Sequence, residues 1–249
     1  MIELVDVSKR FRADAWAVRH VSLTIAAGEL VAVLGESGSG KTTLVKMINR
    51  LLEPDEGRIL VDGVDVRTND PVALRRTIGY VIQHVGLIPH LTVTDNVAMV
   101  PRLLRWAPDR ISARVKELLE LVGLGDAGAR FPDQLSGGQR QRIGVARALA
   151  AEPKLLLLDE PFGALDPITR VALQGELAKL HRTLKLTTVM VTHDLFEALT
   201  LADRIAVMYR AELRQVGTPR ELLASPADDY VARLMGMAKH QTEALTALV

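Results

Sequence analysis

The sequence has no cysteine, few aromatic residues and almost no net charge. Aromatic residues make up 4% of the 249 residues, and 31 lysines and arginines oppose 30 aspartates and glutamates. The absence of cysteine excludes disulfides, thiolate metal sites and cysteine nucleophiles, and it suits a reducing compartment. The balanced charge argues against a general nucleic-acid binder, which normally carries a basic excess. The 48% hydrophobic content is enough for one large core or two modest ones.

Long hydrophobic runs are also lacking. The longest cover residues 30–34 and 155–158, whereas a helix that crosses a bilayer needs about 20 apolar residues. The first six residues include Glu3 and Asp6, so no secretory signal is expected. If the protein works at a membrane, we expect it to do so from outside the lipid.

The sequence does contain an alternation of strand-like and helix-like segments. Short apolar or β-branched runs predict strands, and apolar residues at helical spacing predict helices. The predicted strands cover residues 2–7, 21–25, 30–34, 58–61, 78–82, 155–158, 187–191 and 204–208, and the predicted helices cover 41–52, 111–122, 139–150, 173–184 and a tail from about residue 220. This alternation predicts an α/β fold whose parallel sheet is covered on both faces.

A glycine-rich loop between a predicted strand and a predicted helix is the strongest local signal. Residues 35–42 match the pattern G-x-x-x-x-G-K-[ST] at every fixed position. Glycines let backbone N–H groups turn toward phosphate oxygens, and the helix start adds partial positive charge. Lys41 is expected to reach the β- and γ-phosphates, and Thr42 to ligate Mg²⁺. The residues expected to bind ATP in this loop are Gly35, Glu36, Ser37, Gly38, Ser39, Gly40, Lys41, Thr42 and Thr43.

Two adjacent carboxylates, Asp159 and Glu160, follow the apolar run at residues 155–158. A carboxylate at the end of a buried strand can hold a metal ion, and its neighbour can orient or deprotonate an attacking water. Alone, such a run is explained better as a strand that leaves the core. Beside a phosphate loop, we favour Asp159 as a metal ligand and Glu160 as the residue that activates water.

A third motif, Leu-Ser-Gly-Gly-Gln at residues 135–139, opens a predicted helix with Ser136 as its N-cap. Taken alone, it is equally a second anion-binding helix start and an ordinary serine-capped helix. It lies between the phosphate loop and the two carboxylates, and there it resembles the signature sequence of ATP-binding cassette ATPases. The resemblance extends over essentially the whole chain.

This resemblance implies a fold and a domain plan. The fold is a P-loop (RecA-like) α/β core with a parallel sheet, an N-terminal antiparallel β subdomain and an inserted helical subdomain. We expect one nucleotide-binding domain over residues 1–249, with the core and β subdomain at 1–83 and 154–225. The helical signature subdomain is expected at 84–153 and a helical tail at 226–249, with no C-terminal regulatory domain.

Shorter motifs take their roles from the same resemblance. Phe11 matches the aromatic residue that stacks on adenine, with a core phenylalanine as the alternative. Gln83 matches the glutamine that touches Mg²⁺ or its water, and His193 matches the histidine that contacts the γ-phosphate. Residues 164–166 resemble the loop that couples two active sites through Asp166. The remaining histidines lack convincing metal-ligand spacing; they are His20, His84, His90, His181 and His240.

In the family, two cassettes face each other head to tail with ATP between them. The resemblance therefore implies an ATP-hydrolysing, Mg²⁺-dependent enzyme that forms an ATP-dependent homodimer. Lys41, Glu160 and His193 are the expected catalytic residues. The residues expected to bind ATP in trans are Ser136, Gly137, Gly138 and Gln139.

The resemblance further implies a role in transport. Residues 70–76, 78–90, 100–104 and 162–169 are similar to ATPase subunits of importers for glycine betaine, choline, carnitine or related osmoprotectants. The implied partners are integral-membrane permease subunits and, indirectly, an extracytoplasmic solute-binding protein or domain, with no nucleic acid. Residues 83–96 and the helical middle would form the groove for a permease helix. The implied location is peripheral, on the cytoplasmic face of the cell membrane.

Three other functions stay open beside this one. They are a cassette ATPase of DNA repair, chromosome organisation or translation, a regulatory cassette without turnover, and an importer with another cargo such as amino acids or metal complexes. One departure from the family is also readable, since relatives usually have glycine in the hairpin turn where this chain has Ala211. If the turn needs a positive φ, alanine there costs about 1 kcal/mol relative to glycine.

Overall fold

The computed structural model describes residues 1–12, 15–83, 85–163 and 165–246, with side chains described up to residue 240. The chain divides into two compact units. The first contains residues 1–69 and 189–249, and the second contains residues 70–188. The strand β8 (Thr187–Thr192) runs across the second of these boundaries.

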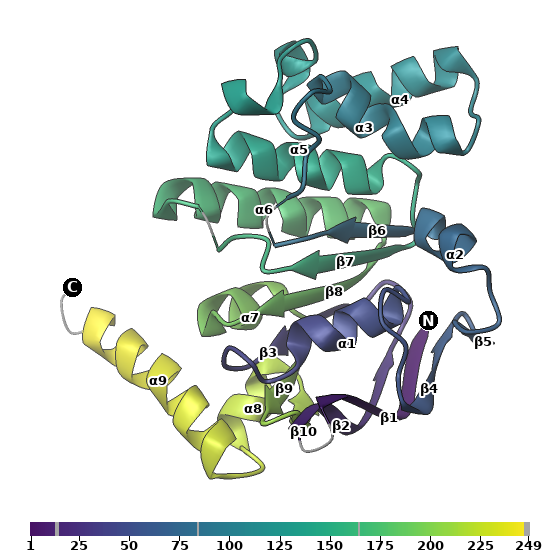
Figure 1. The fold of residues 1–249 in the computed structure, drawn as a ribbon. Coiled ribbons are helices and arrows are strands. Elements are labelled where there is room, and N and C mark those ends of the chain that lie inside the picture. Colours follow the sequence, from purple (N-terminus) through teal and green to yellow (C-terminus); the bar gives the residue numbers. More distant parts are fainter. Residues whose placement is uncertain (13–14, 84, 164, 247–249) are drawn as a thin grey trace. The chain divides into compact units, whose positions relative to one another are not determined.

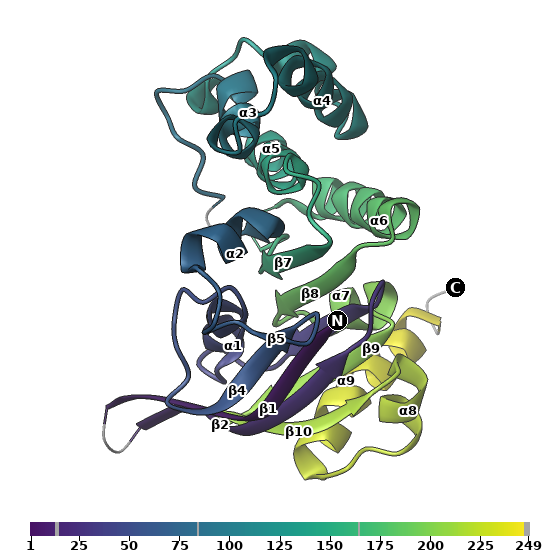
Figure 2. The same ribbon diagram turned by 90° about the vertical axis from the view of Figure 1, so that its right-hand side faces the viewer.

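An antiparallel sheet forms the N-terminal part of the first unit (Figure 2). It contains β1 (Ile2–Arg12), β2 (Ala15–Ile25), β4 (Glu56–Val61) and β5 (Val64–Asp65), in the order β2-β1-β4-β5. Residues 2, 4 and 7 on β1 face the core, while their neighbours at 3, 5 and 6 are exposed. This near-alternation is the pattern of a sheet with one buried face.

A second set of strands in this unit carries the phosphate loop. β3 (Leu30–Leu34) is buried along its whole length and pairs in parallel with β9 (Arg204–Tyr209). β9 turns back into β10 (Glu212–Gly217), to which it is antiparallel. The helices are α1 (Lys41–Ile48), α7 (Leu195–Leu201), α8 (Pro219–Ala224) and α9 (Asp229–Thr246), and α9 packs on α7 and α8.

The predicted helix over residues 41–52 is wrong at its C-terminal end. The helix α1 stops at Ile48 with Asn49 as its C-cap, and Arg50 adopts a left-handed conformation with φ 54°. The Asn49 side chain accepts a hydrogen bond from the backbone N–H of Leu51 at 3.1 Å. A local side-chain acceptor thus competes with continuation of the helix.

The second unit places helices around two parallel strands (Figure 1). β6 (Ile78–Val81) pairs with β7 (Leu155–Asp159), and α5 (Gly137–Leu149) packs against β6. The predicted strand over 78–82 therefore ends one residue early. The other helices are α2 (Pro71–Thr77), α3 (Val93–Leu103), α4 (Pro108–Leu121), α6 (Pro167–Leu184) and the short 3₁₀ turns η1 (Gly125–Ala127) and η2 (Pro132–Gln134).

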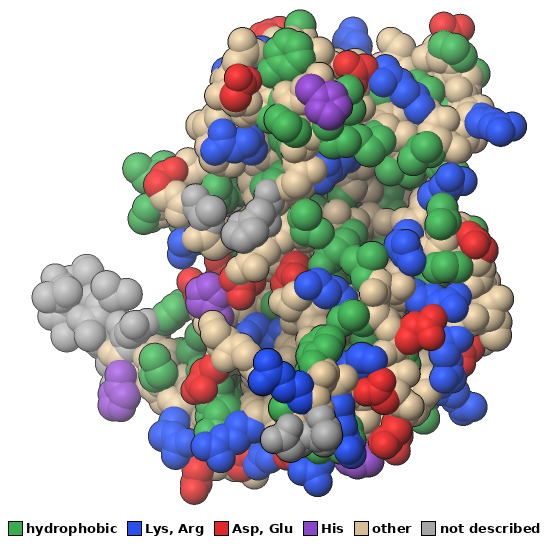
Figure 3. All heavy atoms as spheres, viewed as in Figure 1, with side chains coloured by type: hydrophobic (Ala, Val, Ile, Leu, Met, Phe, Trp, Pro, Cys, Tyr) green, Lys and Arg blue, Asp and Glu red, His purple; other side chains and the backbone are tan. Residues whose placement is uncertain are grey.

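The predicted α/β class is confirmed, with parallel strands in both units and an antiparallel N-terminal sheet. Lysines and arginines are interspersed with aspartates and glutamates on the face seen in Figure 3. Of the helices that the structure describes, none combines the length and the apolar character needed to span a bilayer.

Candidate functional site

The glycine-rich loop connects β3 to α1 in the first unit and is pressed against neighbouring backbone. A Cβ atom on Gly35 would collide with the carbonyl oxygen of Met208, and one on Gly40 would collide with that of Ala17. Gly38 and Gly40 also have φ values of 82° and 103°, which side-chain-bearing residues rarely adopt. The glycines of the motif are therefore required by close approach and by backbone conformation.

The start of α1 presents cationic and donor groups to this loop. The buried Lys41 ammonium donates to the carbonyl oxygens of Gly35 and Glu36, both at 2.8 Å. The N-cap residue Gly40 supplies no side-chain cap to the helix, as far as the described residues show. The hydroxyl of Ser39 is buried without a hydrogen-bond partner in the part of the chain that the structure describes. A helix start without a side-chain cap and a nearby lysine are features that favour binding of a phosphate group.

An exposed aromatic side chain lies on the hairpin of β1 and β2. Phe11, near the end of β1, is 61% exposed, so the alternative of a core phenylalanine is wrong. Beside it in sequence, the Arg10 guanidinium lies 3.5 Å from the centre of the Trp16 ring. Because the carbonyl oxygen of Ala17 on β2 lies against Gly40, this hairpin borders the phosphate loop.

The two carboxylates at the end of β7 have different environments. Asp159 is 3% exposed, and burial, together with the Asp159 charge, raises the pKa of the neighbouring Tyr80 hydroxyl. Glu160 has a left-handed backbone with φ 48°, and its carboxylate accepts a hydrogen bond from Gln83 Nε2 at 2.9 Å. This hydrogen bond joins the Glu160 carboxylate to the residue that follows the strand beside β7. Sequence reasoning missed Tyr80, which only the pairing of β6 with β7 brings near Asp159.

The predicted N-cap of α5 is confirmed. Ser136 Oγ accepts from the backbone N–H of Gln139 at 3.2 Å, and Gln139 Oε1 accepts from the backbone N–H of Ser136 at 3.0 Å. This reciprocal pair is a capping box. Ser136 and Gly137 are exposed, whereas Gly138 is buried and a Cβ there would collide with Thr169. The helix start is thus capped by the side chain of an exposed residue.

Asp166 and His193 stand before helices of different units. Asp166 is the N-cap of α6 and accepts from the Thr169 backbone N–H at 3.0 Å, the main cause of its lowered pKa. Exposed Ile168 follows it, while Ala164 lies outside the described residues. His193 is exposed between β8 and α7, where Asp194 caps the helix through its contact with the backbone N–H of Phe196 at 2.8 Å.

The other histidines have local structural partners or are exposed. His20 pairs with Asp6 at 2.9 Å, and buried His181 lies 3.0 Å from the Thr188 hydroxyl. His90 and His240 are exposed, and His84 lies outside the described residues.

The side chains predicted to ligate Mg²⁺ carry oxygen atoms, the type of ligand that this ion prefers. Thr42 in the first turn of α1 carries a hydroxyl, and Asp159 carries a carboxylate at the end of a buried strand. Mg²⁺ prefers such oxygen ligands and usually completes its shell with waters and substrate phosphates. Groups of three or more acidic or histidine side chains that could hold a metal ion are absent from the described residues.

Comparison with known proteins places these features in a family. Residues 18–163 match the family model for ABC transporters. The chain is 54% identical over 237 residues to the glycine betaine/carnitine/choline transport ATP-binding protein OpuCA of Bacillus subtilis. The aligned region covers 95% of this chain and 62% of OpuCA. It is 50% identical over 239 residues to the sulfate/thiosulfate import ATP-binding protein CysA of Pseudomonas syringae, and this alignment covers 94% of this chain and 72% of CysA. The chain thus spans about three fifths of the length of the first relative.

A solved structure agrees with these relatives. The dimeric ATP-binding cassette MJ0796, in a post-hydrolysis state bound to ADP and Pi, matches with a TM-score of 0.80 and 34% sequence identity, over 88% of this chain and 99% of that one. The motifs at residues 35–42, 135–139 and 159–160 have the order described above. The chain therefore belongs to the ABC transporter family.

Proposed function

We propose that this chain is the ATP-binding and ATP-hydrolysing subunit of an ABC importer. The observation that carries the proposal is the phosphate loop, where the buried Lys41 ammonium is held by the carbonyls of Gly35 and Glu36 at the uncapped start of α1. The Lys41 ammonium donates hydrogen bonds to two carbonyl oxygens of the loop. A bound triphosphate would exchange these contacts for stronger, charge-assisted ones.

The proposed roles of the side chains follow their local environments. Phe11 stacks on the adenine, since its ring is exposed beside the loop. Thr42 and Asp159 supply oxygen ligands to Mg²⁺, and the bound ion would neutralise phosphate charge. Glu160 orients and deprotonates water, with Gln83 holding its carboxylate. The hydrogen bond from Gln83 to Glu160 is thus a second support for the catalytic assignment.

His193 is proposed to contact the γ-phosphate, and Asp166 to couple two active sites. Both side chains stand at helix starts, and each is held there by local capping contacts. Gln83 is further proposed to touch Mg²⁺ or its water and to sense the permease.

The second half of each site comes from another copy of the chain. The proposed contacts in trans are made by Ser136, Gly137, Gly138 and Gln139. The Ser136 hydroxyl accepts from Gln139 N–H and so retains its own proton for a phosphate oxygen. ATP would then join two copies, and hydrolysis would release them. The dimeric cassette of similar structure supports this arrangement.

The proposed importer takes up an osmoprotectant such as glycine betaine, choline or carnitine. The chain would sit peripherally on the cytoplasmic membrane face and contact permease subunits through the helical subdomain proposed at residues 84–153, with a solute-binding protein acting indirectly. The similarity to OpuCA supports this cargo. The 50% identity to a sulfate/thiosulfate import protein favours another small-solute importer as the second candidate.

Phosphate release and reconstitution test the proposal together. The wild-type chain should release phosphate from MgATP, and Glu160→Gln should bind ATP without measurable turnover. Reconstituted with candidate permeases, the wild type should be stimulated by osmoprotectants and not by sulfate. Full turnover by Glu160→Gln would contradict the catalytic assignment, and stimulation by sulfate alone would favour the second candidate.

A further inference from the structure

The phosphate loop rests on the end of β9, which links it to the C-terminal helix. The carbonyl oxygen of Met208 limits the space beside Gly35, and the Met208 methyl carbon would lie 3.2 Å from a Cβ on Gly40. One residue of β9 therefore contacts both ends of the glycine loop. Because the backbone at Gly35 and Gly40 is closely packed, a displacement of this end of β9 is expected to displace the loop as well.

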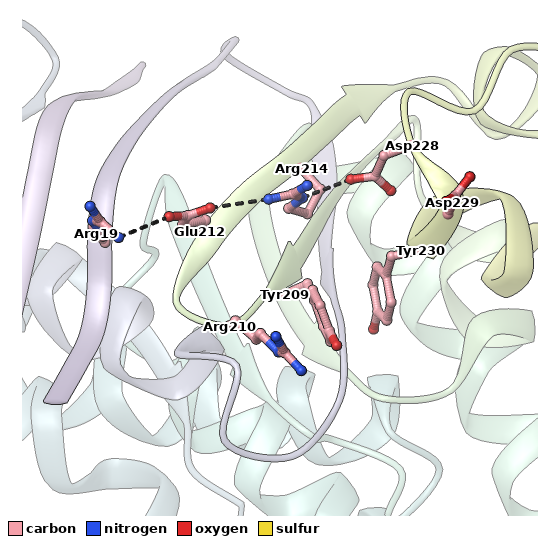
Figure 4. Close-up of a pocket in the computed structure, with 8 residues that line it drawn as sticks. All are labelled: Arg19, Tyr209, Arg210, Glu212, Arg214, Asp228, Asp229 and Tyr230. Atoms are coloured by element: carbon pink, nitrogen blue, oxygen red, sulfur yellow. Dashed lines mark hydrogen bonds and ion pairs between the residues drawn. The ribbon is translucent and has the colours of Figure 1, made fainter.

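The next residue of β9 is held by an aromatic stack. The rings of Tyr209 and Tyr230 have their centres 4.0 Å apart and an angle of 18° between their planes. Figure 4 shows the two rings face to face, one from β9 and one from the first turn of α9. Tyr230 is 9% exposed. Burial, and after it the nearby Glu36 carboxylate, raises the pKa of the Tyr230 hydroxyl, in agreement with a position beside the phosphate loop.

The start of α9 is anchored independently of the stack. Asp228 accepts from the backbone N–H of Val231 at 2.9 Å and pairs with Arg214 on β10 at 2.7 Å. Arg214 pairs in turn with Glu212 at 3.1 Å, and Glu212 pairs with Arg19 on β2 at 3.4 Å, as the dashed lines in Figure 4 show. This chain of ion pairs connects the start of α9, which carries Tyr230, to β10 and β2.

A cavity of about 510 Å³ opens beside the stacked rings. Both tyrosines line it, so neither ring is enclosed on every side by other side chains. The backbone of Tyr209 is held by the pairing of β9 with β10. The Tyr209 side chain borders the cavity and is packed on Tyr230, so loss of the Tyr230 ring would leave the Tyr209 ring with more space at the end of β9.

We infer that Tyr230 is a positioning residue for the phosphate loop. Its ring holds Tyr209 and so keeps Met208 against Gly35 and Gly40, which preserves the loop geometry that receives ATP. The C-terminal helix α9 thereby contributes to ATP affinity without touching the nucleotide. This inference rests on the proposed function, because it concerns the same ATP site.

The test compares three substitutions on α9 by equilibrium binding of MgATP and by turnover. Tyr230→Leu removes the stack and should raise the Kd for MgATP about three- to tenfold, the range that a lost aromatic pair corresponds to. Its kcat should change less than twofold, because the residue does not reach the reacting atoms. Tyr230→Phe keeps the ring, and its Kd for MgATP should equal that of the wild type. Met235→Ala removes another buried side chain of α9 and should lower the melting temperature while leaving Kd unchanged.

A second variant keeps the test decisive if Tyr230→Leu does not fold. Tyr209→Leu breaks the stack from β9 and should raise Kd by a similar factor, and in the folded double variant the two effects should not add. Wild-type Kd in the folded Tyr230→Leu or Tyr209→Leu protein would overturn the inference, as would an equal loss of affinity in Met235→Ala. A wild-type chain that neither binds nor hydrolyses ATP would instead overturn the proposed function.

Discussion

Two helix starts carry the proposed chemistry, and they are built in opposite ways. The start of α1 has no side-chain cap among the described residues, and its N-cap is a left-handed glycine, Gly40. The start of α5 is closed by the capping box of Ser136 and Gln139. Both helix starts attract anions through the helix dipole. They differ in the N-cap, because Gly40 has no side chain with which to cap α1, whereas Ser136 caps α5.

This difference assigns different tasks to the two ends. An uncapped helix start with a buried lysine gains much from a phosphate, so it should bind ATP in a single chain. At the capped helix start, the N–H groups of Ser136 and Gln139 already have side-chain acceptors, so this end offers fewer backbone donors and the hydroxyl of Ser136. It should therefore act late, when a nucleotide already held by another copy is presented to it.

The largest expected effect on turnover comes from a substitution at the start of α1. Lys41→Ala removes the ammonium from the phosphate site and should lower turnover on the order of a thousandfold, since it removes a charged group that stabilises the transition state. ATP binding should weaken as well. Phosphate release and equilibrium binding measure the two effects, with Lys41→Arg as a variant that keeps the charge. Unchanged ATP affinity in Lys41→Ala would contradict the assignment of α1.

A substitution at the start of α5 should lower ATP turnover and leave ATP binding by the monomer unchanged. Ser136→Ala removes the hydroxyl and the cap, so turnover should fall about tenfold or more while the ATP affinity of the monomer stays within twofold of wild type. Loss of the cap should also lower stability by about 1 kcal/mol. Ser136→Thr retains a capping hydroxyl and should recover stability. If Ser136→Ala weakens monomer binding as much as Lys41→Ala, the two helix starts do not differ as described.

The hairpin turn between β9 and β10 in the first unit tests how much glycine at a positive φ contributes to stability. Arg210 and Ala211, between β9 and β10, have φ values of 50° and 68°, the pattern of a type I′ turn. The expected need for positive φ at Ala211 is thus confirmed. Ala211→Gly should stabilise the protein by about 1 kcal/mol or slightly less, seen as a higher melting temperature. A lower melting temperature would mean that the buried Ala211 methyl group matters more than the backbone strain.

The smallest effect concerns a helix start that is capped by a charge. The hydrogen bond from the Thr169 backbone N–H lowers the pKa of Asp166 below its usual 3.8. A lowered pKa stabilises the fold above pH 3.8, and the contribution is lost as the pH falls through the lowered value. The melting-temperature difference between wild type and Asp166→Asn should therefore be constant from pH 7 to 5 and shrink below pH 4. A difference that grows on acidification would contradict this.

The sequence was informative where structure is decided locally. The N-cap role of Ser136 was predicted from its residue type at the start of a helical pattern, and the buried strand β7 from four consecutive leucines. The phosphate loop is equally local. The early end of α1 was missed because it depends on the Asn49 side chain bonding to Leu51.

Contacts between distant segments were not predictable in the same way. Gln83 and Glu160 are 77 residues apart, and their hydrogen bond depends on the pairing of β6 with β7. Tyr209 and Tyr230 come from β9 and α9, and they stack where α9 packs on α7 and α8 and pairs with β10 through Asp228 and Arg214. No short-range pattern encodes such pairings, so the sequence alone gave no reason to single out these tyrosines.

The central claim is that two copies of this chain share each ATP, and the mass of the Glu160→Gln protein in solution tests it most directly. With saturating MgATP, light scattering should give twice the 27.2 kDa of one chain, and the mass should return to one chain when nucleotide is removed. The same protein with Lys41→Ala added should stay at 27.2 kDa under both conditions. A Glu160→Gln protein that binds MgATP and yet stays at the mass of one chain would contradict the account.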